Sequence, residues 1–167
     1  MKTSFLNLLA LFAVSTILFS CSPADDGIYF ENSEVVNTTN VTYTTMENDI
    51  LALVNAHRTS LGLTSLAPLD IISGVADGHT EYMIEVGSVN HDNFSQRAQN
   101  LMDNAGAKTV GENVAYGFST AEGVVNGWLN SPEHKSIIEN PNYTHFGIST
   151  ETNKENRNYF TQIFIKK

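Results

Sequence analysis

The sequence predicts an α+β fold, because its helical patterns come first and its strand patterns come last. Apolar residues recur with the helical period through residues 44–105 and again through residues 119–139. Residues 145–150 and 159–165 alternate apolar and polar side chains, as strands do. Strand and helix patterns do not alternate regularly along the chain. That order argues against parallel βαβ units and favours an antiparallel sheet covered by helices.

Two long helices begin the predicted domain. The first begins near Thr44, which forms a capping-box pattern with Glu47, and Gly62 ends it. The second covers residues 69–86, where apolar side chains form one stripe, and Gly87 ends it.

A third helix, a strand and a fourth helix follow. The third helix covers residues 95–105 and is closed by Gly106. Residues 110–117 have the composition of a strand, with glycine near both ends. Ser119 and Glu122 have the spacing of a capping box and predict the start of the fourth helix.

The last predicted helix is short and leads into the closing hairpin. Ser131 and Pro132 begin it as cap and first residue, and the Asn-Pro pair at residues 140–141 ends it. The two closing strands then enclose a polar turn at residues 153–158.

The N-terminus has the pattern of an exported lipoprotein. Lys2 precedes an apolar stretch within residues 1–20, which reads as a signal peptide. Residues 18–21 resemble a lipobox, although Phe19 is bulkier than usual there, and Cys21 is the only cysteine. We therefore expect lipidation of Cys21 and a protein anchored to a membrane outside the cytoplasm, in the outer membrane or at the cell surface. Ordinary cleavage with a free thiol is the alternative.

The segment behind the signal peptide is polar and acidic. Residues 21–45 are expected to form a flexible tether whose ends lie about 25–30 Å apart, and residues 46–167 to form the domain. The short apolar pieces at residues 28–30 and 35–36 could pack on the domain instead. The formal net charge of −9 argues against nucleic-acid partners and against adhesion to anionic lipid.

Three short motifs carry a family resemblance. They are Asn-His at residues 90–91, Gly-Glu-Asn at residues 111–113, and Trp128 followed by Ser-Pro-Glu-His at residues 131–134. With them the sequence resembles the CAP superfamily, or SCP domain, and specifically its short, cysteine-free bacterial branch. The superfamily includes cysteine-rich secretory proteins, antigen 5 and plant pathogenesis-related proteins. The resemblance covers roughly residues 47–166 and implies a three-layer α-β-α sandwich.

The resemblance also implies a cleft in which two histidines and two acidic residues can bind a divalent cation. His91, Glu112 and His134 match three of these positions. The fourth position, where the family has glutamate, is Ser131 in this chain.

Two neutral imidazoles suit zinc or a similar cation, but a closed zinc site needs four protein ligands. We therefore expect weak, exchangeable binding by His91 and His134, with Glu112 orienting an imidazole or a bound water. His134 falls in the first turn of its helix, where the dipole disfavours a positive ring. The alternative is that both histidines only form hydrogen bonds in the cleft.

Other polar residues are expected to be structural. His57 and His79 lie on apolar helix stripes, where packed, hydrogen-bonded histidines are common. Asn113 and Gln162 match family positions that connect strands to the cleft, although Asn113 could instead face the cleft, and Trp128 fits the core. Asn55 and Arg58, in the first helix, also read as structural contacts.

The sequence leaves the activity open between function classes. It contains no His-Glu-x-x-His motif, nucleophile elbow or phosphate-binding glycine loop. The first expectation is a ligand-binding or interaction module of the cell envelope; lipid, sterol, glycan and protein ligands are known or suggested in the superfamily. The alternative is a metal-dependent, peptidase-like hydrolase with Glu112 as general base beside His91 and His134. A purely structural envelope protein is a third possibility.

Overall fold

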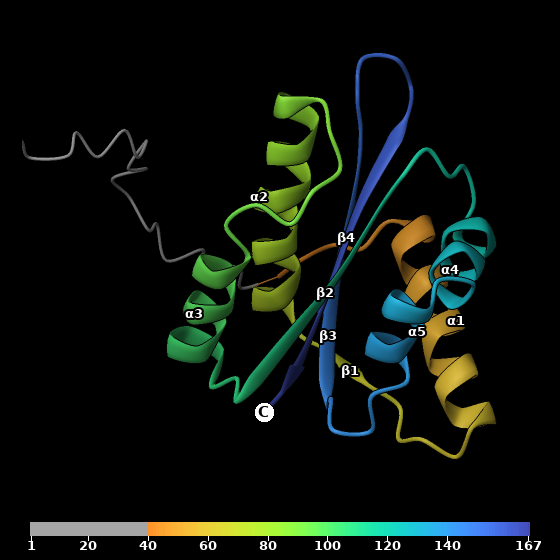
Figure 1. Cartoon of the computed structure of the whole chain (residues 1–167), viewed down its shortest axis with the longest axis vertical. Coiled ribbons are helices and arrows are strands. Elements are labelled where there is room, and N and C mark those ends of the chain that lie inside the picture. The colour runs from red at the N-terminus through yellow and green to blue at the C-terminus, as the bar shows by residue number, and fades with distance from the viewer. Residues whose placement is uncertain (1–39) are drawn as a thin grey trace, which may run out of the picture. The chain divides into compact units, whose positions relative to one another are not determined.

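A computed structural model of the chain describes residues 40–167, which form three layers (Figure 1). The predicted signal peptide, the lipidation of Cys21 and residues 21–39 of the predicted tether lie outside the described residues. The helices are α1 (Thr45–Ser60), α2 (Asp70–Val86), α3 (Phe94–Ala105), α4 (Ala121–Leu129) and α5 (Pro132–Ile138). The strands are β1 (Ala67–Pro68), β2 (Thr109–Tyr116), β3 (His145–Thr152) and β4 (Asn158–Lys166).

The four strands form one sheet in the order β1-β3-β4-β2, with helices on both faces. Helices α2 and α3 cover one face, and α1, α4 and α5 cover the other (Figure 1). Strand β4 pairs antiparallel with β3 and with β2. The predicted α+β sandwich is therefore confirmed. The two-residue strand β1, which pairs parallel to β3, was not predicted because two residues carry no periodic pattern.

Each face of the sheet has its own apolar core. The core under α1, α4 and α5 contains Ile50, Val54, Trp128, Phe146, Phe160 and Phe164. The core under α2 and α3 contains Ile72, Val75, Ala76, Leu101, Ile163 and Ile165. Successive strand residues point to opposite faces, so neighbouring side chains of β4 enter different cores.

Several predicted helix boundaries are confirmed by their caps. Thr44 and Glu47 form a complete capping box at the start of α1. Gly87 and Gly106 end α2 and α3 in the left-handed conformation that glycine adopts without strain.

Two predicted caps differ in the structure. Helix α4 is capped by Thr120, whose Oγ1 accepts from Gly123 N at 3.0 Å, rather than by Ser119. Ser119 and Thr120 are both hydroxyl residues that could cap a helix beginning here, so the sequence does not distinguish them. In the structure Thr120 occupies the cap position. Ser131 occupies the cap position of α5 as predicted, but its side chain makes no capping hydrogen bond.

The buried Arg58 fastens the end of α5 to α1. Its Nη1 donates to the carbonyl oxygens of Ile138 and Asn140 at 2.6 and 2.9 Å, and its Nε donates to Thr64 O at 3.0 Å. Asn55 exchanges two hydrogen bonds with the main chain of Leu66, at 2.8 and 2.9 Å. Both residues are structural, as predicted.

The folded domain begins a few residues earlier than the sequence indicated. Val41 N donates to Asp70 Oδ2 at 3.3 Å, and Tyr43 OH lies 2.9 Å from Ser73 Oγ. The last residues assigned to the tether therefore contact α2. No helix within residues 40–167 is long and apolar enough to span a membrane.

Candidate functional site

Glu112 lies near the middle of β2, the strand at one edge of the sheet, and its side chain is 1% exposed. It points to the face covered by α2 and α3, whereas its neighbours Gly111 and Asn113 point to the face covered by α5. The predicted motif is thus part of a strand, as expected, and that strand begins at Thr109.

The Glu112 carboxylate is paired with Arg97 of α3. Arg97 Nε donates to Oε2 at 2.8 Å, and Arg97 Nη2 donates to Oε1 at 2.7 Å. A third N–H, on Nη1, donates to Asp92 O at 2.6 Å. Two parallel hydrogen bonds to one carboxylate are the strongest arrangement available to an arginine.

These contacts also set the protonation state of Glu112. Burial alone raises the pKa of Glu112, but the hydrogen bonds from His91 and Arg97 and the charge of Arg97 outweigh it. The pKa therefore lies below its ordinary value, and Glu112 is an anion at neutral pH.

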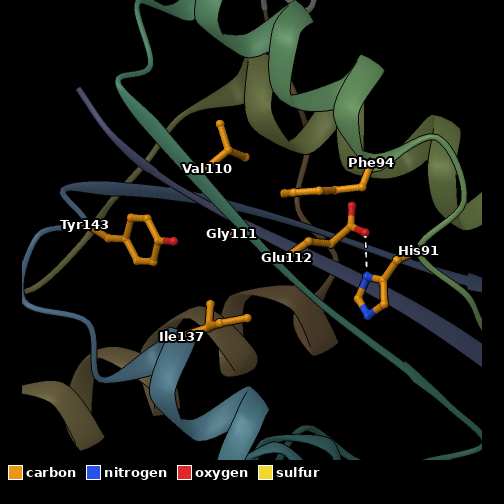
Figure 2. A pocket seen from close by; sticks show the side chains of 7 residues that line it. All are labelled: His91, Phe94, Val110, Gly111, Glu112, Ile137 and Tyr143. Carbon is orange, nitrogen blue, oxygen red and sulfur yellow. Dashed lines mark hydrogen bonds and ion pairs between the residues drawn. The ribbon is translucent and has the colours of Figure 1, made fainter.

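His91 is the exposed partner of this carboxylate. Its Nδ1 lies 2.8 Å from Glu112 Oε1, and the side chain is 50% exposed. Because an ionised carboxylate only accepts hydrogen bonds, Nδ1 is the donor, which leaves Nε2 available. Figure 2 shows the second ring nitrogen directed away from Glu112.

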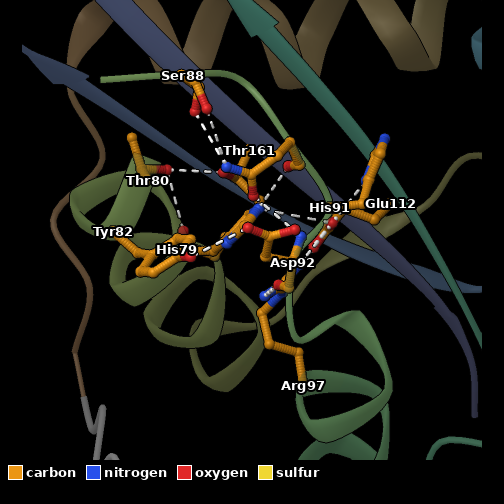
Figure 3. A network of polar contacts seen from close by, with 11 residues as sticks. His79, Thr80, Tyr82, Ser88, His91, Asp92, Arg97, Glu112 and Thr161 are labelled. Atoms are coloured by element: carbon orange, nitrogen blue, oxygen red, sulfur yellow. Dashed lines mark hydrogen bonds and ion pairs between the residues drawn. The ribbon is translucent and has the colours of Figure 1, made fainter. Parts of the chain in front are cut away.

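His79 supports the loop that carries His91. Its Nε2 donates to Asn90 O at 2.9 Å and lies 3.8 Å from Glu112 Oε1 (Figure 3). Burial, followed by the charge of Arg97, lowers the pKa of His79, so its ring is neutral. The prediction of a packed, hydrogen-bonded histidine is confirmed. Its proximity to Glu112 was not foreseen.

The sequence prediction missed Arg97 altogether. A carboxylate buried in the core requires a cationic partner, and Arg97 is the only Lys or Arg within residues 59–107. That isolated cation in an amphipathic helix was the signal that could have identified it.

His134 lies near this group, although it does not line the pocket beside it. Asn113 Nδ2 donates to His134 O at 3.2 Å, which ties α5 to β2 as the family position of Asn113 implied. Burial, followed by the charge of His91, lowers the pKa of His134. The direction agrees with the prediction, but these causes differ from the helix dipole we invoked.

A pocket of about 320 Å³ lies beside Glu112 and is lined by side chains from both faces of β2 (Figure 2). Its lining consists of His91, Phe94, Val110, Gly111, Glu112, Ile137 and Tyr143. The pocket is mainly apolar, with His91 and Glu112 at one end.

Gly111 is required by the shape of this pocket. A Cβ atom at Gly111 would collide with the Tyr143 hydroxyl and lie 3.2 Å from Ile137 Cγ2. Any larger residue would therefore intrude between these two side chains.

The donor set limits what cation the site could hold. Both carboxylate oxygens of Glu112 already accept hydrogen bonds from Arg97 or His91. Within residues 40–167, no group of three or more His, Cys, Asp or Glu side chains is arranged to hold a metal ion. The available donors fit at most a weak two-imidazole site at His91 and His134, and cation binding there stays a prediction.

Two bacterial relatives resemble most of this chain. The uncharacterized membrane protein YlbC of Bacillus subtilis (strain 168) is 36% identical over 129 residues, covering 74% of this chain and 35% of that protein. The uncharacterized protein YkwD of the same organism is 34% identical over 124 residues, covering 72% and 47%. The chain thus spans between a third and a half of the length of these curated relatives.

Solved structures share the fold. An outer surface protein from Borrelia burgdorferi superposes with a TM-score of 0.66 at 24% identity, covering 74% of this chain and 96% of that one. An extracellular protein containing an SCP domain from Bacillus anthracis superposes with a TM-score of 0.64 at 26% identity, covering 77% and 45%.

The family model for the cysteine-rich secretory protein family (CAP) matches residues 51–164, which include every motif of the site. With a matching sequence model over most of the domain and matching folds in solved structures, the chain belongs to the CAP family.

Proposed function

We propose that this chain is a lipid-anchored CAP-domain protein outside the cytoplasm, and that its pocket between α3 and α5 binds a ligand of the cell envelope. The observation that carries the binding role is the pocket itself, which sits beside an ionised carboxylate held by Arg97 and His91. Apolar walls with a few oriented polar groups are typical of ligand sites.

The proposed location rests on the N-terminal sequence and on relatives. Residues 1–20 have the signal-peptide pattern, and Cys21 follows a lipobox-like triplet. YlbC is described as a membrane protein, and the two solved relatives as outer-surface and extracellular proteins.

The bonding of Glu112 favours ligand binding over catalysis. A general base must accept a proton, and its pKa is best placed near the working pH. Both oxygens of Glu112 are engaged, and its pKa is below the ordinary value. In this site Glu112 orients the His91 ring, and the exposed Nε2 of His91 is the polar group that meets a ligand.

One observation supports the alternative of metal-dependent hydrolysis. A histidine whose Nδ1–H is fixed by a carboxylate is the usual arrangement for a metal-binding imidazole. His91 and His134 would then hold the cation, which would supply an activated water, and Glu112 would only orient His91. Hydrolysis of peptide or ester probes that is lost in His91→Ala but kept in His145→Ala would favour this alternative.

The anchor is tested by fractionating cells that express wild type or Cys21→Ala. We expect wild type in the membrane fraction and the variant in the soluble extracytoplasmic fraction, because the lipid on Cys21 is the proposed attachment. Equal membrane retention of both proteins would contradict the anchor.

The pocket is tested by recording NMR spectra of the mature chain with lipid, glycan and peptide probes. We expect at least one class to shift the signals of His91, Phe94 and Ile137. Ile137→Trp, which fills the pocket, should abolish these shifts, whereas Met102→Trp, at an exposed site on α3, should keep them. Shifts confined to other surfaces would contradict the proposed pocket.

A further inference from the structure

The outer edge of β2 carries main-chain groups directed away from the sheet. Tyr116 of β2 lies opposite Tyr159 of β4, so the next residue, Gly117, lies opposite Asn158. Gly117 N donates to Asn158 O at 2.8 Å, which makes these two residues a hydrogen-bonded pair. In an antiparallel pair, residues bonded to the partner alternate with residues that are not. The odd-numbered residues of β2 therefore bond to β4, and the even-numbered residues turn their N–H and C=O groups outward.

An independent contact confirms this alternation. Val114, an even-numbered residue, uses its carbonyl oxygen to accept a hydrogen bond at 3.1 Å from Trp128 Nε1, which lies outside the sheet. Val110 and Glu112 have the same outward orientation. Among residues 40–167, no main-chain or side-chain partner pairs with their outward N–H and C=O groups.

The pocket lies over this same edge. Phe94 and His91 line it from the α3 side, and Ile137 and Tyr143 line it from the α5 side, with Gly111 between them (Figure 2). A ligand that fills the pocket must therefore cover the outward main-chain groups of the strand. Covering them without replacement hydrogen bonds is costly, since a buried unpaired amide loses its bonds to water.

This geometry points to an extended peptide segment of another polypeptide as the ligand, paired with β2 as a fifth strand. The inference rests on the proposed binding role of the pocket and names its ligand class. An extended peptide repeats its outward N–H and C=O groups every second residue, which matches the spacing of Val110 and Glu112.

The walls of the pocket also fit the side chains of such a strand. Successive side chains of an added strand point alternately toward Phe94 and toward Ile137, and both walls are apolar. An acyl chain would pack against the apolar walls but would leave the main-chain N–H and C=O groups of β2 without hydrogen-bond partners. A glycan would offer polar groups but leave Phe94, Ile137 and Tyr143 against polar atoms. The volume of about 320 Å³ suits a short segment rather than a folded partner.

The test uses ¹⁵N-labelled mature chain and a capped pentapeptide of alternating valine and threonine. Two N-methylated versions with equal numbers of methyl groups serve as matched ligands: in one the methyl groups replace amide hydrogens that face β2, and in the other they replace amide hydrogens on the far edge. We expect the unmodified peptide to shift the amide signals of Val110 and Glu112 and to slow their hydrogen exchange. Methylation of the edge that faces β2 should weaken binding roughly tenfold, and far-edge methylation should leave it within about twofold.

A protein variant provides a second readout. Val110→Pro removes one outward donor at an edge position where proline is tolerated, and Val110→Thr retains the donor with a similar shape. We expect the proline variant to bind the peptide several-fold more weakly than the threonine variant. Thermal melts of both variants establish that the comparison is made between folded proteins.

Each other outcome overturns the inference in a distinct way. Equal binding of both N-methylated peptides, or shifts away from Val110 and Glu112, excludes strand pairing. Slow exchange of these two amides in the chain without peptide means that the edge is already closed to water at Val110 and Glu112, where Glu112 as a whole is 4% exposed, and that no free edge is offered to a peptide. If a short acyl probe shifts His91 and Ile137 while peptides do not, the pocket binds a ligand but not by strand addition. If neither probe shifts them, the proposed binding function fails as well.

Discussion

Arg97 and Glu112 form an ion pair that is almost completely removed from water, with side chains 11% and 1% exposed. Each carboxylate oxygen accepts one N–H of the guanidinium group. Removing a carboxylate from water is costly unless a cation and hydrogen bonds compensate. The position of Glu112 in the folded domain therefore depends on Arg97.

We expect Arg97→Ala to lower the free energy of unfolding by about 3–5 kcal/mol, because it leaves a buried carboxylate without its cation. The double variant Arg97→Ala, Glu112→Leu should recover part of that loss, since it removes the buried charge as well. Urea unfolding at pH 7 measures both.

Lys135→Ala serves as the control for losing a positive charge. Lys135 lies 3.7 Å from Glu139 at an exposed site, where an ion pair contributes at most about 1 kcal/mol. A double variant less stable than Arg97→Ala alone would contradict a destabilising buried carboxylate.

Acid should weaken the domain through Glu112. Its pKa in the folded chain lies below the ordinary value of 4.5, so the unfolded chain takes up the proton at a higher pH. Glu112 therefore contributes stability above pH 4.5, and that stability is lost as the pH falls through the folded pKa. We expect Glu112→Gln to be less stable at pH 7 and to lose less stability on acidification. Urea midpoints between pH 7 and pH 3 measure this.

Glu155→Gln, in the exposed turn between β3 and β4, is the matched removal of a carboxyl group. If the urea midpoint of Glu155→Gln falls with acid as little as that of Glu112→Gln, the loss of stability in acid does not come from the buried pair of Arg97 and Glu112.

Gly111→Ala should be destabilised by about 1–3 kcal/mol, because the new Cβ collides with the Tyr143 hydroxyl. Tyr143→Phe removes that hydroxyl, so the double variant should be more stable than Gly111→Ala alone. Thermal melts of wild type, the two single variants and the double variant give the coupling free energy between the two positions. Gly78→Ala, whose Cβ would meet nothing within 4 Å in helix α2, should instead be neutral or stabilising. Equal losses at both glycines would contradict a local collision.

Zinc should bind weakly through His91 and His134 and be lost in acid. Only a neutral imidazole coordinates a metal, so protons compete as the pH falls, and the lowered pKa of His134 delays this competition at that ring. Calorimetry should show heat in wild type that disappears in the double variant His91→Ala, His134→Ala. His145→Ala removes a histidine from the start of β3 and should behave as wild type. Unchanged heat in the double variant would mean that zinc binds elsewhere.

The sequence predicted those features that short local patterns encode. The family resemblance carried by the Gly-Glu-Asn and Asn-His motifs implied that Glu112 and His91 meet, and His91 Nδ1 lies 2.8 Å from Glu112 Oε1. Capping residues and glycines predicted the ends of α1, α2 and α3 within about two residues.

The features that sequence reasoning missed depend on contacts between distant segments. Arg97 pairs with a carboxylate 15 positions away, and no periodic pattern relates the two. Strand β1 exists only because β3 lies beside it. Tyr43 was assigned to the tether because its segment is polar, and only its contact with Ser73 shows that it belongs to the domain.

Each wall of the pocket is fixed by an arginine whose side chain is mostly or completely buried. Arg97 lies one helical turn from Phe94 on α3 and is bonded to β2, and Arg58 holds the main chain at the end of α5, next to Ile137. Separating α3 from β2 would expose the carboxylate of Glu112, and moving the end of α5 would take from Arg58 Nη1 both of its acceptors, which are main-chain carbonyl oxygens at that end. The pocket is therefore preorganised: a ligand meets walls that are already in place and does not pay to order them. The shape of a molecule then determines whether the pocket binds it, because a preorganised pocket gains affinity only for molecules that fit it unchanged.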